Sequence, residues 1–400
     1  MSQTERSYTV RAAHCDHRAS DETIAQALDR ITEPLTRSWE RLESAATVVV
    51  KANIVWPPEQ IRLHAGRRQE LVDESVLRAV LGLLKRRCRG RVILADTTLV
   101  PDHRDFFFLD LLRELDVEFV NCNEPPFATL AAPDGGAMFG SYTFHETVAR
   151  ADALVSLAAL KTHAFAGITL CSKNLFGWCP VHPTTRPRSY FHHLVRLPYV
   201  FADLAATLRP VLNIVDGLVG QSRVEWGGEA RETNALLAGD HTLATDLCGA
   251  ALMGHDPYAD WPTPPFRRDR NHLLVGVEQG WGPASLGEVD FQHDLEPPLG
   301  LFDSQATDSH ERVASWHRSM CEQALDYRDD PEPYHRAYAG EYILLQDGVV
   351  LGHSGDPIGR RSRRELSGAK PDRAIWLKYV DPEETEAERF AVYDRVLASA

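Results

Sequence analysis

The sequence predicts a Rossmann-like α/β fold, in which a mainly parallel, layered sheet carries helices on both faces. Two observations support this prediction: short apolar runs end in polar residues, and they alternate with segments of helical periodicity. The expected strands are residues 47–55, 91–96, 117–121, 153–157, 211–216 and 234–238, and the expected helices are 70–87, 106–115 and 242–253. Gly254 is the expected C-terminal cap of the last helix, with Asp240 at its N-terminal end.

Three parts are expected along the chain. A main α/β domain that carries the site covers 1–300, a helical connection covers 301–339, and a small α/β appendage covers 340–400. An Asp-Gly turn inside 341–351 predicts a hairpin in the appendage, which 374–380 extends by a strand. Residues 179–199 hold many proline, histidine and arginine residues, and this composition favours a long loop that covers a binding site.

Composition narrows the function classes. The chain has 400 residues and a net charge of −14, which disfavours nucleic acid as a partner. No apolar run is long enough to span a membrane, the first residues lack a secretory pattern, and the seven cysteines are scattered. We therefore expect a cytoplasmic protein without a membrane partner, and the sequence leaves open whether two copies form a homodimer.

Lysine is rare, and its positions are informative. Only six of the 43 basic residues are lysines, so arginine is the default cation of this chain. Arginine replaces lysine on a solvated surface but not where a compact or titratable amine is required. Lys51, Lys161 and Lys173 fall in segments that attract attention for other reasons, and we expect them to form a cationic site.

Polar residues stand where the expected strands end. Lys51 and Asn53 end one strand, Lys161 and His163 follow another, and Lys173 with Asn174 lies in 168–177, which has helical spacing. Because ligands bind at the carboxyl ends of parallel strands, these side chains are expected to converge on one crevice that holds an anion. The alternative is that each residue simply ends a strand in solvent or caps a helix.

Carboxylates supply the expected second half of the site. Asp96 and Asp216 each end a strand, and Asp246 lies on a helix among apolar neighbours. Asp216 or Asp246 would orient His163 or accept a proton, whereas a salt bridge from Asp246 to a site lysine is the structural alternative. The glycine-rich segment 217–228 is expected to form a loop beside the site.

The 179–199 loop offers both ligand-binding residues and a metal hypothesis. We expect Arg186, Arg188, His192 and His193 to close over the ligand. A metal ion held by Cys171, Cys179 and His182 is the alternative, although this spacing matches no established zinc motif. The chain also lacks the phosphate-loop and dinucleotide fingerprints, so no cofactor is predicted, with a metal ion as the open alternative.

Several of these segments together resemble one family. Lys51-Ala-Asn53, Leu160-Lys-Thr-His163, Ser172-Lys-Asn-Leu-Phe-Gly177, Ile214-Val-Asp-Gly217 and Ala244-Thr-Asp246 follow the order seen in the domain of unknown function 362, over roughly residues 45–290. The resemblance implies the fold and the location of the site. Members are often labelled iron–sulfur proteins, but this chain lacks the ferredoxin-like cysteine module on which that label rests.

The leading functional hypothesis is an enzyme that acts on a small, carboxylated anion by acid–base chemistry. Lys51, Lys161 and Lys173 would stabilise developing negative charge and His163 would move the proton. Isomerisation, epimerisation or elimination in a specialised biosynthetic pathway fits this residue set. The alternatives are a metal-dependent or redox enzyme that uses the Cys/His loop, and a non-catalytic module that binds an anion.

Overall fold

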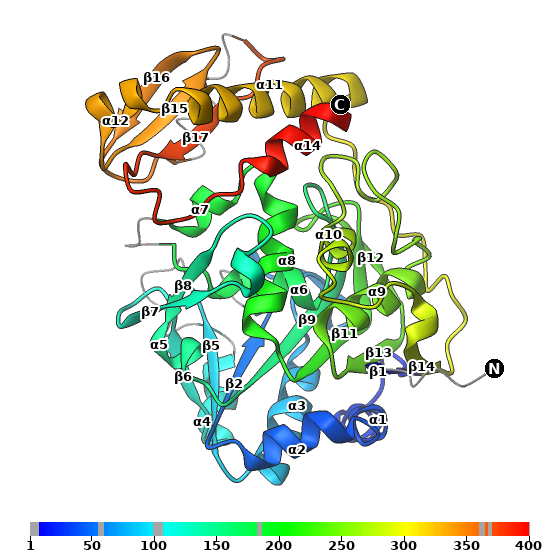
Figure 1. Ribbon diagram of the computed structural model, residues 1–400. Helices are drawn as coiled ribbons and strands as arrows, with labels where there is room; N and C mark the ends of the chain where they lie inside the picture. The colour runs from blue at the N-terminus through cyan, green and yellow to red at the C-terminus, as the bar shows by residue number, and fades with distance from the viewer. Residues whose placement is uncertain are drawn as a thin grey trace, which may run out of the picture.

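The computed structural model describes residues 8–54, 60–98, 106, 108–181, 186–359, 365–366 and 370–399. In this part of the chain a central sheet of ten strands has the order β14-β1-β13-β11-β9-β2-β5-β6, with β10 paired to β9 and β12 to β11. Strands β11, β9, β2, β5 and β6 are mutually parallel, and β13 runs antiparallel to both neighbours. The predicted α/β fold is therefore confirmed (Figure 1).

Six strands of the central sheet, β2, β5, β6, β9, β11 and β13, correspond to the predicted apolar runs, and β10 and β12 were not among those runs. The strands of the sheet are β1 (Tyr8–His14), β2 (Thr47–Ala52), β5 (Arg91–Asp96), β6 (Glu118–Asn121), β9 (Ala153–His163), β10 (Gly167–Thr169), β11 (Leu212–Ser222), β12 (Glu229–Arg231), β13 (Ala235–Gly239) and β14 (Val289–His293). Two small hairpins, β3 (Leu63–His64) with β4 (Arg67–Arg68) and β7 (Phe127–Ala131) with β8 (Ser141–His145), lie outside it. Strands β1 and β14 were not predicted from the sequence.

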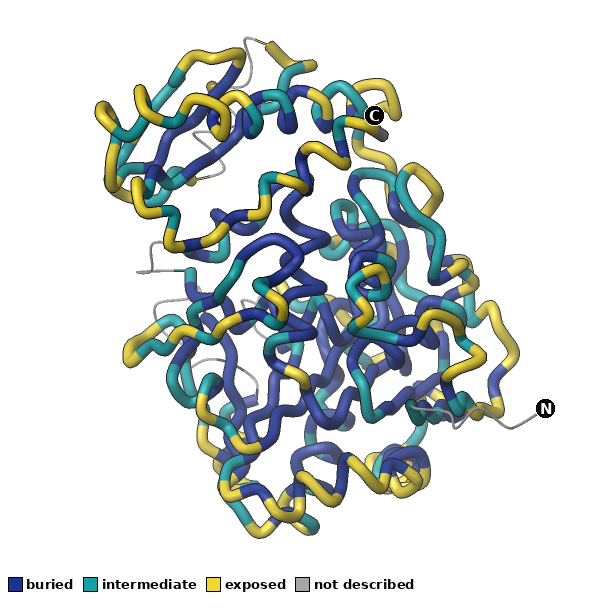
Figure 2. The backbone as a smooth tube through the Cα atoms, in the orientation of Figure 1, coloured by how far each residue is buried: buried dark blue, intermediate teal, exposed yellow. Residues whose placement is uncertain are grey.

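Helices cover both faces, and the strand side chains divide between them. Val48 and Val50 of β2 pack in one apolar core and Val49 in the other, as the alternation of a strand requires. One face holds α1 (Asp21–Thr32), α2 (Thr36–Ser44), α3 (Glu74–Arg87) and α4 (Phe108–Glu114), and the opposite face holds α6 (Cys171–Asn174), α8 (Arg196–Leu208), α9 (Thr242–Leu252) and α10 (His272–Glu278). The central strands are buried between these layers (Figure 2).

A C-terminal lobe lies above the main sheet in the view of Figure 1. Its elements are α11 (His310–Asp329), α12 (Glu332–Tyr338), β15 (Tyr342–Gln346), β16 (Val349–Ser354), β17 (Trp376–Tyr379) and α14 (Ala391–Ser399). The predicted hairpin is present, with positive φ at Asp347 and Gly348. The lobe is joined to α8 by a buried network in which Lys378 contacts Glu386 and Glu388, and Arg196 contacts Glu388 at 2.8 Å.

Three local predictions differ from the structure. Residues 168–177 are not one helix: β10, the single turn α6 and a 3-10 turn at Leu175–Trp178 share them, because β10 pairs with the end of β9. The expected loop 179–199 contains α7 (Arg188–Phe191) and the start of α8. At α9 the N-terminal cap is His241 rather than Asp240, whose carboxylate accepts from Thr9 and pairs with Arg37 instead. Gly254 follows α9 with φ of +86°, as expected of a C-terminal cap.

Candidate functional site

The site is built at the carboxyl edge of the parallel strands. Lys51 is near the end of β2, Asp96 is the last residue of β5, and Lys161 and His163 close β9. The register pairs Ala52 with Leu157 on β9, so these strand ends lie at the same edge of the sheet. Both lysines are only 2% exposed and His163 is 4% exposed, so the charged groups have left bulk water. The predicted convergence of Lys51, Lys161 and His163 at one edge therefore matches their placement.

Lys51 is held in a buried ion pair. Its Nζ donates to Asp96 Oδ2 at 3.0 Å and to the carbonyl of Ala52 at 2.7 Å. Burial lowers the pKa of Lys51 and raises that of Asp96, and each is partly offset by the opposite charge. A Cβ at Gly177 would lie 2.2 Å from Lys51 Cε, so only glycine fits beside this amine.

Arg188, at the start of α7, completes this ion-pair group. Its Nη2 donates to Thr97 Oγ1 and to the carbonyl of Gly177, and its Nε donates to the carbonyl of Cys179 at 3.1 Å. Burial lowers the pKa of Arg188, and the nearby carboxylate of Asp96 partly opposes this shift. Of the four loop residues predicted to surround a ligand, Arg188 is thus the one fixed next to Lys51.

Lys161 occupies a second, more unusual environment. Its Nζ donates to the carbonyl of Glu70 at 2.6 Å and lies 4.6 Å from the centre of the Trp226 ring. Burial lowers the pKa of Lys161 to about 7, and the positive charge of Lys173 contributes in the same direction. A lysine in this state is divided between amine and ammonium near neutral pH, which is the condition for a general base.

The hydrogen bonds of His163 fix its tautomer. Nδ1 accepts from the backbone N–H groups of Phe165, at 3.0 Å, and Ala166, at 3.3 Å. The proton of the neutral ring therefore resides on Nε2, which lies 3.6 Å from Glu225 Oε1. His163 is consequently arranged to donate through Nε2, because Nδ1 already serves as an acceptor.

The loop between β11 and β12 covers these groups. Glu225 accepts from the backbone N–H of Ala164 at 3.1 Å, and the N–H of Gly227 donates to the side chain of Glu70. With Trp226 over Lys161, three consecutive residues of the loop contact the site. The predicted loop 217–228 is wrong over its first half, because residues 217–222 belong to β11 and pair with β9 and β12. Its second half does form a loop beside the site, where the sequence did not identify Glu225 as the carboxylate next to His163.

The two predicted carboxylates act elsewhere. Asp246 accepts from the N–H groups of Cys171, at 2.8 Å, and Ser172, at 2.7 Å, and from the Ser172 hydroxyl. It thereby caps α6, which carries Lys173 and Asn174, and burial raises its pKa to about 6. The expected salt bridge or His163 contact is replaced by this cap.

Asp216 accepts hydrogen bonds from the N–H groups of Asp73, at 2.7 Å, and Leu218, at 3.0 Å. Burial raises its pKa to about 7, and the nearby Asp73 carboxylate adds to that effect. These contacts join β11 to the start of α3. The predicted orienting role for His163 is thus taken by Glu225 and the backbone amides.

Two asparagines leave buried acceptors without donors. Asn174 Nδ2 donates to the carbonyls of Lys51 and Leu157 and to the Ser156 hydroxyl, at 3.0–3.2 Å. The backbone N–H of Asn53 also donates to Leu157. Among the described residues, neither Asn53 Oδ1 nor Asn174 Oδ1 has a hydrogen-bond partner. Both amides were predicted at the site, and each carries a buried acceptor without a donor.

The remaining loop residues are distributed differently. The ring of His192 lies 5.4 Å from that of Phe165, beside the site. His193 Nε2 accepts from the N–H of Leu377, and Arg186 lies 4.0 Å from Glu386, so both face the C-terminal lobe. The expectation that all four loop residues surround one ligand is wrong for Arg186 and His193, because the lobe engages them.

The metal alternative named Cys171, Cys179 and His182, and the structure describes the two cysteines. Cys171 and Cys179 are both buried, and the Cys171 thiol lies 3.5 Å from the carbonyl of Ile214. Burial raises the pKa of the Cys179 thiol to about 12. His182 lies outside the described residues. Within the described ranges, no group of three or more His, Cys, Asp or Glu side chains is arranged to hold a metal ion.

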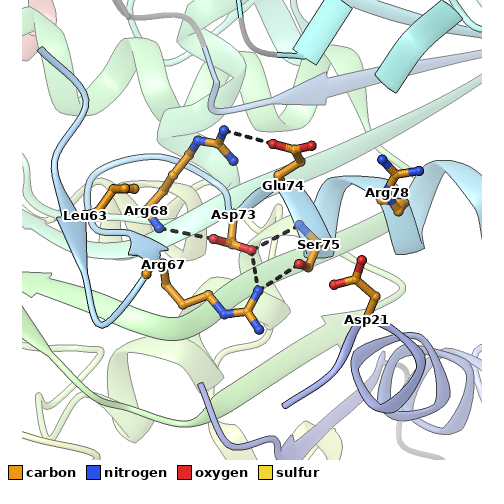
Figure 3. Close-up of a pocket in the computed structure, with 9 residues that line it drawn as sticks. Asp21, Leu63, Arg67, Arg68, Asp73, Glu74, Ser75 and Arg78 are labelled. Atoms are coloured by element: carbon orange, nitrogen blue, oxygen red, sulfur yellow. Dashed lines mark hydrogen bonds and ion pairs between the residues drawn. The ribbon is translucent and has the colours of Figure 1, made fainter. Parts of the chain in front are cut away.

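A cavity of about 300 Å³ lies next to Asp216, around the start of α3 (Figure 3). Its central residue is Asp73, which accepts from Arg67 Nη1 at 2.9 Å and from the backbone N–H groups of Arg68 and Ser75. Arg68 in turn pairs with Glu74 at 3.1 Å. The dashed contacts in this view join Arg67, Arg68, Asp73, Glu74 and Ser75, whereas Arg78 pairs with Glu114 outside it. Through these contacts Asp73 ties the β3–β4 hairpin to the start of α3.

Comparison with known proteins identifies the family. Residues 48–251, about half of the chain, match the family described as domain of unknown function (DUF362), and the chain belongs to that family. The resemblance found in the sequence is thereby confirmed. The chain is also 22% identical over 247 residues to the thylakoid-associated protein sll1697 of Synechocystis sp., covering 59% of this chain and 71% of that protein.

A solved structure shows a more distant likeness. The lactate racemase apoprotein from Thermoanaerobacterium thermosaccharolyticum matches with a TM-score of 0.37 and 14% identity, covering 63% of this chain and 58% of that one. The chain thus spans less than two thirds of the racemase. A likeness of this degree says nothing about the activity of the present protein. No helix in the described ranges is long and apolar enough to cross a membrane.

Proposed function

We propose that this protein is an enzyme that moves a proton on a small, carboxylated metabolite, as an isomerase, epimerase or lyase does. The observation that carries the proposal is that two buried groups lie two residues apart at the end of β9: Lys161, whose pKa is lowered to about 7, and His163, whose tautomer presents Nε2–H. One group accepts a proton near neutral pH and the other donates a hydrogen bond or a proton. Two such groups on one strand end meet the minimum requirement for proton transfer at a carbon next to a carboxylate.

Charge explains why an anion would be bound. Lys51 and Lys173 both lie close enough to Lys161 to lower its pKa. When the neutral amine of Lys161 removes a proton from the substrate, it becomes an ammonium beside a newly formed enolate, and the two charges attract each other. The empty site therefore disfavours the protonated form of Lys161. The same ammonium becomes favourable once the negative charge of the enolate develops beside it.

The unpaired amide oxygens narrow the substrate class. A buried carbonyl without a donor is unfavourable, and the deficit disappears if the ligand brings a hydroxyl or ammonium group. Asn53 Oδ1 and Asn174 Oδ1 are two such acceptors near the end of β2. We therefore propose a carboxylated substrate with at least one hydroxyl or amino group, such as a hydroxy acid or an amino acid.

The covering loop would control access. Lys161 and His163 are almost completely buried, and Trp226 and Glu225 lie directly against them. A substrate can reach the amine only when the segment with Trp226 moves away. Closure would then exclude water and strengthen the electrostatic interactions within the site.

Deuterium exchange tests the proposal even when the product has not been identified. The protein is incubated in D2O with a panel of small hydroxy and amino acids, and loss of the α-proton signal is followed by NMR. Isomerisation, epimerisation and elimination next to a carboxylate each break the bond to the α-proton, so the α-proton signal of the substrate is lost either by exchange with D2O or by conversion to product. We expect exchange with at least one compound in the wild type and its loss in Lys161→Met and His163→Asn.

Lys85→Met is the matched control, because Lys85 is a partly exposed lysine of α3 that pairs with Asp116. It should retain wild-type exchange. Exchange of the same rate in Lys161→Met would exclude Lys161 as the base, and a panel without exchange in the wild type would contradict the proposed reaction class.

A further inference from the structure

A second cavity, of about 480 Å³, lies at the opposite edge of the sheet. It is partly open to solvent, and its lining residues come from β1, α2, the end of α8, the turn between β13 and α9, and the segment after α10. Figure 1 shows where these elements lie. Val211 lines it, and the N–H of Val211 donates to Leu154 near the start of β9. Lys161 is seven residues further along that strand, or about 20 Å away at the rise of a β-strand. One small ligand cannot contact both places.

The cavity carries uncompensated positive charge. Three arginines line it, and the one carboxylate among the lining residues is Asp240, which pairs with Arg37 at 2.6 Å. Arg41 and Arg209 are exposed to solvent beside the cavity. Arg209 Nε donates to the carbonyl of Ala206, and no hydrogen bond or ion pair joins Arg41 to any described residue. Two guanidinium groups therefore remain without a carboxylate, and such groups bind phosphate or carboxylate oxygens in pairs.

The same cavity contains rings and a donor without an acceptor. The rings of Tyr8 and His241 lie 4.7 Å apart. His241 Nδ1 accepts from the N–H of Ala244, and burial lowers the pKa of this imidazole to about 4, so the ring is neutral at pH 7. Trp281 also lines the cavity, and its indole N–H is buried with no hydrogen-bond partner among the described residues. A buried donor in this state calls for an acceptor.

We propose that this cavity is a second ligand site, which binds an organic anion with at least two negative charges and an aromatic ring, of the size of a nucleoside diphosphate. Arg41 and Arg209 bind the charged groups, and Tyr8, His241 and Trp281 surround the ring. The apolar side chains of the lining, such as Leu243, exclude water from it. The volume lies within the range of about 300 to 1,000 Å³ that is typical of small-molecule sites.

Calorimetric titration of the full chain with ADP tests the site. We expect saturable binding to the wild type and binding at least about tenfold weaker to the double variant Arg41→Ala, Arg209→Ala, because each charged hydrogen bond contributes on that order. Arg113→Ala is the matched control, since Arg113 is an exposed arginine of α4 that pairs with Asp110. It should bind ADP like the wild type, and so should Lys161→Met if the two sites are separate.

Pyrophosphate and adenosine separate the two parts of the proposal. Each should bind more weakly than ADP, since pyrophosphate lacks the ring and adenosine lacks the charge. Absence of ADP binding up to about 1 mM, or equal affinity in the double variant, would overturn the site. Pyrophosphate that binds as tightly as ADP would overturn the role of the rings, and adenosine that binds as tightly would overturn the role of the arginines.

Discussion

The ionisation of Lys161 is the property that most directly tests the proposed chemistry. An ordinary lysine has a pKa of 10.5, and burial with the nearby Lys173 lowers that of Lys161 to about 7. The lowered pKa means that the folded protein disfavours the ammonium form of Lys161, relative to the neutral amine, by about 5 kcal/mol more than water does. At pH 7 about half of the molecules would carry a neutral amine, compared with about 1 in 3,000 for a normal lysine.

The titration can be observed directly because the chain has only six lysines. With lysine labelled at Cε, the six signals are followed by NMR from pH 5 to 11, and the Lys161 signal is assigned by its absence in Lys161→Met. We expect a midpoint near 7. In Lys173→Met the midpoint should rise by about one pH unit, because a neighbouring positive charge has been removed. Lys85→Met should leave it unchanged.

Stability gives an independent measure of the same shift. Because the pKa of Lys161 is lower in the folded state, the unfolded chain binds more protons between pH 7 and 10.5, and folding becomes more favourable as pH rises through this range. Lys161→Met removes this penalty. The gain in free energy of unfolding that the substitution brings should therefore be about 3 kcal/mol larger at pH 6 than at pH 9, as measured by urea denaturation. A Lys161 midpoint above 9, or a variant effect that does not depend on pH, would refute the argument.

Two further predictions concern residues behind the site. Asp246→Asn should lower the free energy of unfolding by about 2 kcal/mol in urea denaturation, because one oxygen that accepts from α6 becomes a donor; no change would contradict the cap. His272 is fully buried and its pKa is lowered to about 3, so the folded protein loses stability as pH falls below 6.5, by about 2 kcal/mol at pH 5. His272→Phe should make the wild-type loss between pH 7 and pH 5 smaller by about 2 kcal/mol, while His241, whose pKa is lowered to about 4, keeps its own contribution. A variant with the same pH dependence as the wild type would exclude the assignment.

Much of the scaffold followed from local patterns. The apolar runs at residues 91–96 and 153–157 correspond to β5 and β9, because a strand buried on both faces requires continuous apolar residues whatever surrounds it. The Asp347-Gly348 turn was predictable for a similar reason, since its backbone conformation depends on those two residues. The structure of segment 168–177 was not predictable from local patterns. Its apolar residues have helical spacing, but its first residues pair with the end of β9, and that pairing exists only in the folded sheet.

The site was predictable in location and less so in its partners. The scarcity of lysine identified Lys51 and Lys161, and the rule that ligands bind at carboxyl strand ends placed them together. Asp216 and Asp246 were plausible partners for His163 because both are buried carboxylates. The carboxylate that lies beside it is Glu225, on a loop whose course no periodic pattern describes.

The sequence by itself determined the alternation of strands and helices, the membership in the family and the strand end at which the lysines stand, because periodicity and composition are properties of neighbouring residues. Only the tertiary structure decided that Lys161 loses water and shares its surroundings with Lys173, that His163 is locked as a donor through Nε2, and that Asp246 caps α6. Ionisation and tautomer depend on burial and on hydrogen-bond partners brought together from distant parts of the chain, and no local pattern specifies these.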